Sequence, residues 1–235
     1  MATVAIVGAT GLVGSNFLAL SRTAELPGIT SVVAITRRPV KESLTTGGTK
    51  QVSNVVTTDI PASIPPSTKI LFSGLATTRA AAGGFDNQYK IDHDLNLAIA
   101  KAAKAVGVST YVLVSSTGAS VDSRFAYTRM KGELDRDVEA LGFERTIILR
   151  PAQILGKREE GHAFLEGTAQ GVVKFLKKVP FVGNAAKLIG VDAEEIANAA
   201  WKAIQKGGSG VEIYGNEAII KLAKEYNDEI EAKSK

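Results

Sequence analysis

The feature that most limits the fold of this chain is a glycine-rich turn after its first apolar segment. Val4–Val7 is a short aliphatic run, and glycine then recurs every third residue, at Gly8, Gly11 and Gly14. Such a turn joins a buried strand to a helix and lets backbone N–H groups face a phosphate. Gly8 permits the sharp turn, Gly11 the approach of a phosphate, and Gly14 the packing of the helix. The turn therefore predicts a βαβ unit that binds a dinucleotide.

Strand-like and helical segments alternate along most of the chain. The expected strands are Val4–Val7, Ser31–Thr36, Gln51–Val56, Lys69–Ser73, Tyr111–Ser115, Thr146–Leu149 and Val211–Tyr214. The expected helices are Leu12–Arg22, Tyr89–Val106, Arg124–Leu141 and Ala193–Gln205. Several strands are continuous aliphatic runs, which is typical of strands that are covered on both faces. The alternation predicts an α/β fold with a Rossmann-type, doubly wound, mostly parallel sheet.

Length and hydropathy favour one domain. The chain has 235 residues, of which 45% are hydrophobic, and this is enough for one sizeable core. We expect a cofactor core at about 1–156 and a smaller, substrate-facing portion at about 157–235. The region from Gly156 to Gly190 is less regular and is expected to form a small C-terminal cap. The first strand follows Met1 almost directly, so we expect no removable leader.

Composition argues against several kinds of site. The chain has no cysteine and only two histidines, His93 and His162, so we expect neither a disulfide nor a metal centre. The net charge of +4 comes from lysines and arginines that are spread along the chain. We interpret most of them as solvated surface and a few as cofactor contacts, and we expect no nucleic-acid partner.

The end of the second strand indicates which dinucleotide is bound. NAD-selective sites place a carboxylate there to bind the ribose hydroxyls, whereas this chain has Arg37 and Arg38. Two guanidiniums can hold a 2′-phosphate through bidentate hydrogen bonds, so the predicted cofactor is NADP(H). The other interpretation is an exposed, solvated arginine pair. Asp59, after the third strand, is either an adenine contact or a turn residue.

A tyrosine and a lysine four residues apart are the candidate catalytic pair. Tyr127 and Lys131 share one face of a predicted helix. A nearby ammonium lowers the pKa of a phenol, so Lys131 would help Tyr127 exchange a proton with a carbonyl or alcohol oxygen. Gly132 indicates a close packing contact, because glycine inside a helix costs about 1 kcal/mol relative to alanine.

Three hydroxyls follow the fifth strand, at the edge of the sheet where ligands bind in doubly wound folds. They are Ser115, Ser116 and Thr117. One of them is expected to polarise the substrate oxygen. Ser116 is our choice, and Ser115 and Thr117 stay open as alternatives.

Longer strings of residues resemble a known family. They are Leu75–Gly84, Gln88–Leu97, Asp122–Phe125, Lys131–Glu133 and Leu149–Pro151. With the glycine turn and the Tyr/Lys pair, they resemble atypical short-chain dehydrogenases/reductases. More narrowly, they are similar to the fungal "found in mitochondrial proteome" proteins, relatives of the human HIV-Tat-interacting oxidoreductase. The resemblance is close over roughly residues 2–156 and looser beyond.

The resemblance implies NADP(H) binding, an undefined carbonyl or alcohol substrate, and peripheral association with the mitochondrial outer membrane. By position, the residues that would cradle the pyrophosphate are Gly8, Thr10, Gly11, Leu12, Val13 and Gly14. Arg37 would bind the 2′-phosphate. The residues that would line the path to the nicotinamide, or flank it, are Leu75, Ala76, Thr77, Pro151 and Ile154.

Some interpretations stay open. Asp92 and Asn96, one turn apart, either orient loops near the cofactor or act as ordinary caps. Val172–Phe181 mixes lysines with apolar residues, and either lies on an anionic membrane or forms a basic helix over the cleft. The main rival to an oxidoreductase is a non-enzymatic NADP(H)-binding regulator at the mitochondrial outer surface. A sugar-nucleotide epimerase is less favoured, because the part after Gly156 is short for a nucleotide-sugar lobe.

Overall fold

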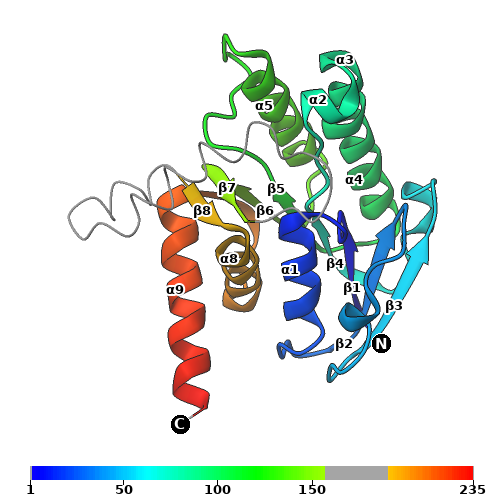
Figure 1. The fold of residues 1–235 in the computed structure, drawn as a ribbon, viewed down its shortest axis with the longest axis vertical. Helices are drawn as coiled ribbons and strands as arrows, with labels where there is room; N and C mark the ends of the chain where they lie inside the picture. Colours follow the sequence, from blue (N-terminus) through cyan, green and yellow to red (C-terminus); the bar gives the residue numbers. More distant parts are fainter. Residues whose placement is uncertain (1, 157–189, 235) are drawn as a thin grey trace.

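Seven strands form one sheet in which every neighbouring pair is parallel (Figure 1). The computed structural model describes residues 2–156 and 190–234. The strand order is β3-β2-β1-β4-β5-β6-β9. These strands are β1 (Ala2–Val7), β2 (Ile29–Thr36), β3 (Gln51–Val56), β4 (Thr68–Ser73), β5 (Thr110–Val114), β6 (Arg145–Arg150) and β9 (Gly210–Gly215). The order reverses direction between β1 and β4, which makes the sheet doubly wound, as the sequence predicts.

Helices connect the strands and cover the sheet. The longer ones are α1 (Leu12–Ser21), α4 (Asn96–Ala105), α5 (Ala126–Glu139), α8 (Ala193–Lys206) and α9 (Asn216–Lys233). The short ones are α2 (Arg79–Ala82), α3 (Phe85–Tyr89), η1 (Glu42–Leu44), η2 (Pro61–Ser63) and η3 (Lys90–Leu95), of which η3 is π-helical. A separate parallel pair is formed by β7 (Gln153–Leu155) and β8 (Gly190–Asp192).

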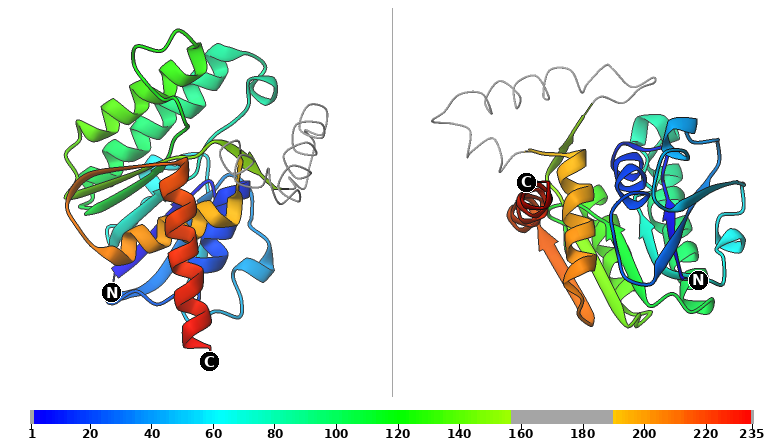
Figure 2. Two further views of the ribbon diagram at one scale, coloured as in Figure 1. Left: turned by 90° about the vertical axis from the view of Figure 1, so that its left-hand side faces the viewer. Right: turned by 90° about the horizontal axis from the view of Figure 1, so that it is seen from below.

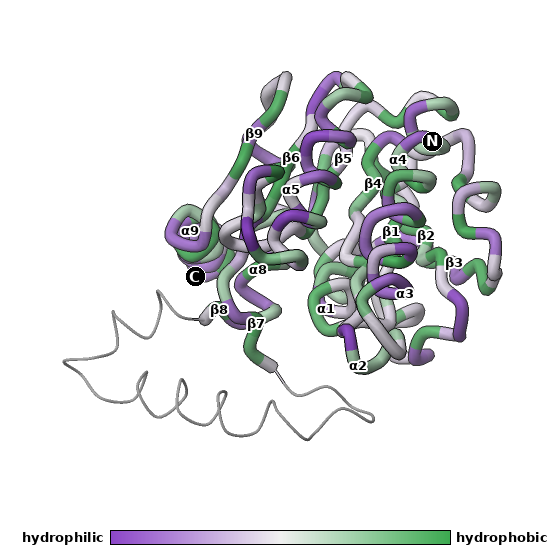
Figure 3. The backbone as a smooth tube through the Cα atoms, turned by 90° about the horizontal axis from the view of Figure 1, so that it is seen from above, coloured by the Kyte–Doolittle hydropathy of each residue, from purple (hydrophilic) through white to green (hydrophobic). Residues whose placement is uncertain are grey.

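Alternate residues of each central strand enter two cores on opposite faces of the sheet. In β1, Val4 and Ile6 pack in the core that includes α1, α8 and α9. Ala5 and Val7 pack in the core that includes α4 and α5. The two helical layers are visible in Figures 1 and 2, and the central strands carry the most hydrophobic stretches (Figure 3). Burial on both faces explains the continuous aliphatic runs in the sequence.

The C-terminal region differs from the expected substrate-facing portion at about 157–235. Residues 190–234 belong to the body of the fold, because β9 pairs with β6 and α8 packs against α1. Buried residues of α8 and α9 are part of the same core as β1. The division at about residue 156 stays a prediction, while residues 190–234 pack in the same body as the first strands. The cap itself and Val172–Phe181 fall within 157–189, outside the described residues.

Two further differences concern the helices. The expected helix Tyr89–Val106 is two segments, η3 and α4, and α3 ends at Tyr89. The long helix α9 is absent from the expected elements, as is the β7–β8 pair. The other expected strands and helices match the observed ones to within a few residues.

Candidate active site

The glycine turn connects β1 to α1 at the centre of the sheet. Gly8 has a φ of +81°, and an added Cβ would lie 2.7 Å from the carbonyl carbon of Gly74. A Cβ on Gly14 would lie 2.2 Å from the carbonyl oxygen of Gly8, so the helix can approach the turn only with glycine there. Gly11 precedes α1 and contributes no side-chain cap. The first N–H groups of α1 are thus available to an anion.

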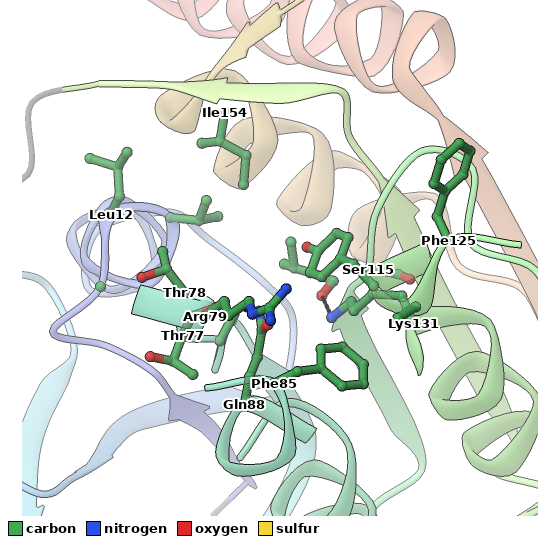
Figure 4. A pocket seen from close by; sticks show the side chains of 17 residues that line it. Leu12, Thr77, Thr78, Arg79, Phe85, Gln88, Ser115, Phe125, Lys131 and Ile154 are labelled. Carbon is green, nitrogen blue, oxygen red and sulfur yellow. Dashed lines mark hydrogen bonds between the residues drawn. The ribbon is translucent and has the colours of Figure 1, made fainter. Parts of the chain in front are cut away.

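A cavity of about 660 Å³ lies where the turn meets the carboxyl ends of β4 and β5 (Figure 4). This volume is within the range of cofactor and substrate pockets. Its lining residues are Gly11, Leu12, Val13, Gly74, Ala76, Thr77, Thr78, Arg79, Phe85, Gln88, Val114, Ser115, Phe125, Ala126, Tyr127, Lys131 and Ile154. The cavity therefore brings the end of the glycine turn, at Gly11, together with the predicted Tyr/Lys pair.

Tyr127 and Lys131 occupy different depths of the cavity. Tyr127 lies in the first turn of α5 and is 41% exposed, whereas Lys131 is 1% exposed. The Lys131 ammonium donates a hydrogen bond to the carbonyl oxygen of Val114 at 3.2 Å. Burial lowers the pKa of Lys131 below its ordinary value, although the carboxylates of Asp92 and Asp135 act in the opposite direction. A phenol at the surface of the cavity thus stands one helical turn from a buried amine.

The three candidate hydroxyls all lie at the mouth of this cavity or beside it. Ser115 is buried and lines the same cavity as Lys131. Ser115, Ser116 and Thr117 also line an adjoining cavity of about 520 Å³ together with Tyr127. Ser116 donates to the carbonyl oxygen of Thr117 at 3.3 Å, and Thr117 donates to that of Arg150 at 2.9 Å. Of the three, only Ser115 lines the main cavity with Lys131, and the choice among them stays open.

Asp135 is a buried acid beside the cavity that was not among the predicted site residues. Asp135 is 1% exposed and accepts a hydrogen bond from Arg150 at 2.9 Å. Burial raises the pKa of Asp135, while Ser115, Arg150 and Lys131 each lower it. Asp135 lies four residues after Lys131, so the helical spacing that joins Tyr127 to Lys131 was a signal for it as well.

Asp92 and Asn96 hold the loop that follows β4. Asp92 accepts a hydrogen bond from the N–H of Thr77 at 2.7 Å. Asn96 donates to the carbonyl oxygen of Leu75 at 3.1 Å and accepts from the hydroxyl of Ser73 at 2.7 Å. Both side chains are fully buried. Of the two interpretations of this pair, loop orientation is confirmed.

The predicted cofactor residues fall into two groups. Those that line one or both cavities are Gly11, Leu12, Val13, Ala76, Thr77, Lys131, Pro151 and Ile154. Those that line neither are Gly8, Thr10, Gly14, Arg37, Arg38, Asp59 and Leu75. Arg37 and Arg38 are exposed at the end of β2. The carboxylate of Asp59 accepts a hydrogen bond from the N–H of Ala62 at 3.2 Å, as a turn residue does, and its contact with adenine stays a prediction.

Sequence reasoning missed one wall of the cavity. Arg79, Phe85, Gln88 and Phe125 line it from α2, α3 and the start of α5. No short-range pattern distinguishes these side chains from ordinary surface residues. In contrast, Gly132 is explained, because an added Cβ there would lie 2.3 Å from the carbonyl carbon of Ser120.

Residues 4–215 match a family model described as the NAD dependent epimerase/dehydratase family. This chain belongs to that family. The match spans the glycine turn, the cavity and the sheet through β9. It agrees with the resemblance to atypical short-chain dehydrogenases/reductases that the sequence carries.

Fungal relatives are similar over most of the chain. The protein named "Protein FMP52, mitochondrial" of Eremothecium gossypii is 41% identical, over 94% of this chain and 97% of its own. The protein named "Protein fmp52, mitochondrial" of Emericella nidulans is 48% identical, over 74% of each chain. These relatives confirm the narrower resemblance to the fungal family.

Solved structures of low sequence identity share the fold. One is UDP-glucose 4-epimerase from Bifidobacterium longum in complex with NAD+ and UDP, with a TM-score of 0.66 and 13% identity. That match covers 91% of this chain and 77% of the epimerase. Another is MoeE5 in complex with UDP-glucuronic acid and NAD, with a TM-score of 0.65, 16% identity, and coverage of 91% of this chain and 75% of that one. The comparisons confirm the Rossmann-type fold.

Within 2–156 and 190–234, no helix is both long enough and apolar enough to cross a membrane. In the same part of the chain, no group of three or more metal-ligating side chains lies together.

Proposed function

We propose that this protein is an NADP(H)-dependent oxidoreductase that reduces a carbonyl group or oxidises the corresponding alcohol. The observation that carries the proposal is the shared cavity of Gly11, Tyr127 and Lys131. Family membership supports a nicotinamide cofactor. The preference for NADP(H) over NAD is our own inference from Arg37 and Arg38, which are exposed and have no hydrogen-bond or ion-pair partner among the described residues.

The residues present fit a bound dinucleotide. The turn has no room for a side chain at Gly8 or Gly14, and the N-terminus of α1 offers uncapped N–H groups to a pyrophosphate. Leu12, Ala76 and Ile154 line the adjoining space. When bound there, the nicotinamide would supply or accept a hydride.

With the dinucleotide bound, side chains of this chain would transfer the proton. Tyr127 donates a proton to the carbonyl oxygen on reduction and takes one from the hydroxyl on oxidation. Lys131 is positively charged in its protonated form and thereby favours the ionised phenol. Ser116 polarises the substrate oxygen, with Ser115 or Thr117 as the alternative hydroxyl.

The proposal is tested with purified protein and a matched pair of tyrosine variants. We expect Tyr127→Phe to keep NADPH affinity but to lower kcat for aldehyde reduction at least about a hundredfold, as the loss of an acid–base group does. Tyr226→Phe, outside both cavities, is the control. Equal turnover by wild type and Tyr127→Phe would overturn the catalytic role. If NADPH binds but no carbonyl compound is reduced, the regulatory, non-enzymatic alternative is favoured instead.

Sugar-nucleotide epimerisation is a second candidate, because the similar solved structures include two UDP-glucose 4-epimerases and a complex with UDP-glucuronic acid. We favour the oxidoreductase because this chain covers only 75% to 82% of those enzymes' lengths. Incubation with UDP-glucose and NAD+ separates the two. Formation of UDP-galactose would establish epimerase activity and displace our proposal.

We also propose a mitochondrial location, with peripheral attachment to the outer membrane. Its support is that similar fungal proteins are named mitochondrial. The measurement is fractionation of cells that carry the tagged protein. Release from intact mitochondria by alkaline carbonate and digestion by added protease would support this location. Protection from protease in intact mitochondria would contradict it.

A further inference from the structure

One wall of the main cavity has a chemistry that the proposed reaction does not use. Arg79, Phe85 and Phe125 contribute to it, and in Figure 4 the two phenyl rings lie farther from Leu12 than Arg79 does. Phe125 is 77% exposed, the highest value among the large hydrophobic side chains that are described as exposed. An apolar ring at the rim of a cavity is a surface that the apolar part of a ligand can cover.

One contact positions the ring of Phe85, and another positions the backbone of Phe125. Phe85 packs edge-on against Tyr89, with ring centroids 6.3 Å apart. Phe125 immediately precedes α5, and its N–H donates to the hydroxyl of Ser123 at 3.2 Å. The Phe85 ring and the Phe125 backbone are therefore positioned, and both residues line the same cavity as Tyr127.

Arg79 is the available charge on this wall. It is exposed, and its guanidinium has no hydrogen bond or ion pair with the side chain or backbone of any other described residue. In Figure 4 its guanidinium projects into the cavity, toward the side where Ser115 and Lys131 lie. Lys131 is already engaged by Val114 and two carboxylates, and Gln88 by Thr77 and Asp92.

The rest of the lining leaves the charge of Arg79 uncompensated. None of the described residues that line this cavity is an aspartate or a glutamate. A free guanidinium beside apolar rings matches a ligand with a carboxylate and an apolar body, because guanidinium binds carboxylates through two parallel hydrogen bonds.

We infer that the substrate is an anionic carbonyl compound, with a carboxylate that pairs with Arg79 and an apolar or aromatic body that lies against Phe85 and Phe125. The inference rests on the proposed function and adds a substrate class to it. The other anion available to Arg79 is the pyrophosphate of the cofactor. The experiment therefore has to distinguish a substrate carboxylate from the cofactor pyrophosphate.

The test uses two aldehydes of similar size, 4-carboxybenzaldehyde and 4-methylbenzaldehyde. Binding to NADP+-saturated protein is measured by calorimetry, and NADPH-dependent reduction is measured separately. We expect the carboxylate compound to bind about tenfold more tightly and to have a kcat/KM about tenfold higher. Arg79→Gln should remove both preferences without changing NADPH affinity. Arg124→Gln, an exposed arginine outside the cavity, is the control and should keep them.

A second variant tests the apolar rim. Phe125→Ala should weaken the binding of both aldehydes by a similar factor of about three to ten and leave the carboxylate preference intact. Its side chain is mostly exposed, so a loss of folding is not expected, and a urea unfolding curve checks this.

Three results would overturn the inference. The first is equal binding of the two aldehydes to wild type. The second is a carboxylate preference that Arg79→Gln retains. The third is a loss of NADPH affinity in Arg79→Gln with equal slowing of both aldehydes, which would assign Arg79 to the cofactor pyrophosphate. Failure of the proposed function looks different: the carboxylate preference in binding persists, and neither aldehyde is reduced.

Discussion

The carboxylate of Asp92 accepts a hydrogen bond from the backbone N–H of Thr77 at 2.7 Å. This contact fixes the loop after β4, which lines the cavity at Ala76 and Thr77, to the π-helical turn η3. Asp92 also favours the charged form of Lys131. One buried acid therefore connects the cofactor side of the cavity with the candidate catalytic helix. π-Helical turns are often found at functional sites.

We expect Asp92→Ala to weaken NADPH binding about tenfold and to lower the free energy of unfolding by about 1 to 3 kcal/mol. The reason is that the buried N–H of Thr77 loses its acceptor and the loop loses its anchor. Calorimetric titration and urea unfolding measure the two effects. Asp86→Ala, at an exposed position of α3, is the control. Unchanged NADPH affinity in Asp92→Ala would show that the loop does not need this anchor.

Gly11 and Gly14 should fail in different ways when they are replaced by alanine. At Gly14 the new Cβ would lie 2.2 Å from the carbonyl oxygen of Gly8, so α1 must move and the protein should lose about 1 to 3 kcal/mol of stability. At Gly11 the Cβ would lie 3.2 Å from the same oxygen and would otherwise point into open space. Gly11→Ala should therefore fold normally but bind NADPH at least about tenfold more weakly. Equal NADPH affinity of Gly11→Ala and wild type would contradict a pyrophosphate site at the glycine turn.

Gly132→Ala should destabilise the protein although alanine is the better helix former. The helical preference gains about 1 kcal/mol, but the Cβ would collide with the backbone of Ser120 at 2.3 Å. We expect a net loss of about 1 to 3 kcal/mol in the free energy of unfolding. Gly215→Ala, where an added Cβ meets nothing within 4 Å, is the matched control. A stabilised Gly132→Ala variant would show that the loop at Ser120 yields easily.

The buried amine of Lys131 predicts a pH dependence of stability. Burial lowers its pKa below the ordinary 10.5, so between the two values the unfolded chain binds a proton that the native state has released. The free energy of unfolding therefore gains a contribution that rises with pH across this window, by about 1.4 kcal/mol per pH unit, and is fully present above it. Lys131→Met lacks this contribution.

Urea unfolding from about pH 7 to about pH 10 measures the prediction. The difference in stability between wild type and Lys131→Met should shift in favour of wild type as the pH rises. Lys90→Met, at an exposed position, is the control, and its free energy of unfolding should change with pH in parallel with that of wild type. Parallel curves for wild type and Lys131→Met would mean that the amine keeps its ordinary pKa in the folded protein. Above this range the ionisation of Tyr89 has the opposite effect on stability, because burial raises the pKa of Tyr89 to about 12.

Much of the fold was predictable because its signals are local. The aliphatic run Val4–Val7 and the three glycines after it identify β1 and the turn, and these define the topology around them. The helical spacing of Tyr127 and Lys131 correctly placed both in one cavity. In contrast, β7 and β8 have three residues each, too few for a periodic pattern, and they pair across a long separation in the chain.

Other features depend on tertiary contacts that a short window does not contain. Arg79 and Phe125 belong to the site only because α2 and the start of α5 converge on the cavity. The hydroxyls of Ser115, Ser116 and Thr117 are adjacent in sequence, and their order alone does not tell which one faces a substrate. For α9 a signal was present, since Ile219, Leu222, Ala223 and Tyr226 are buried at helical spacing.

The packing of Trp201 on Phe17, with ring centroids 5.7 Å apart, has a consequence for how the protein is made. Phe17 is in the helix that follows the glycine turn, and Trp201 is in α8, so the first βαβ unit leaves the ribosome long before its partner is synthesised. The part of α1 that packs against α8 must remain uncovered until nearly the whole polypeptide has emerged. Nascent chains that stall before α8 should therefore be targets for chaperones and proteases, and a dinucleotide could stabilise them only weakly.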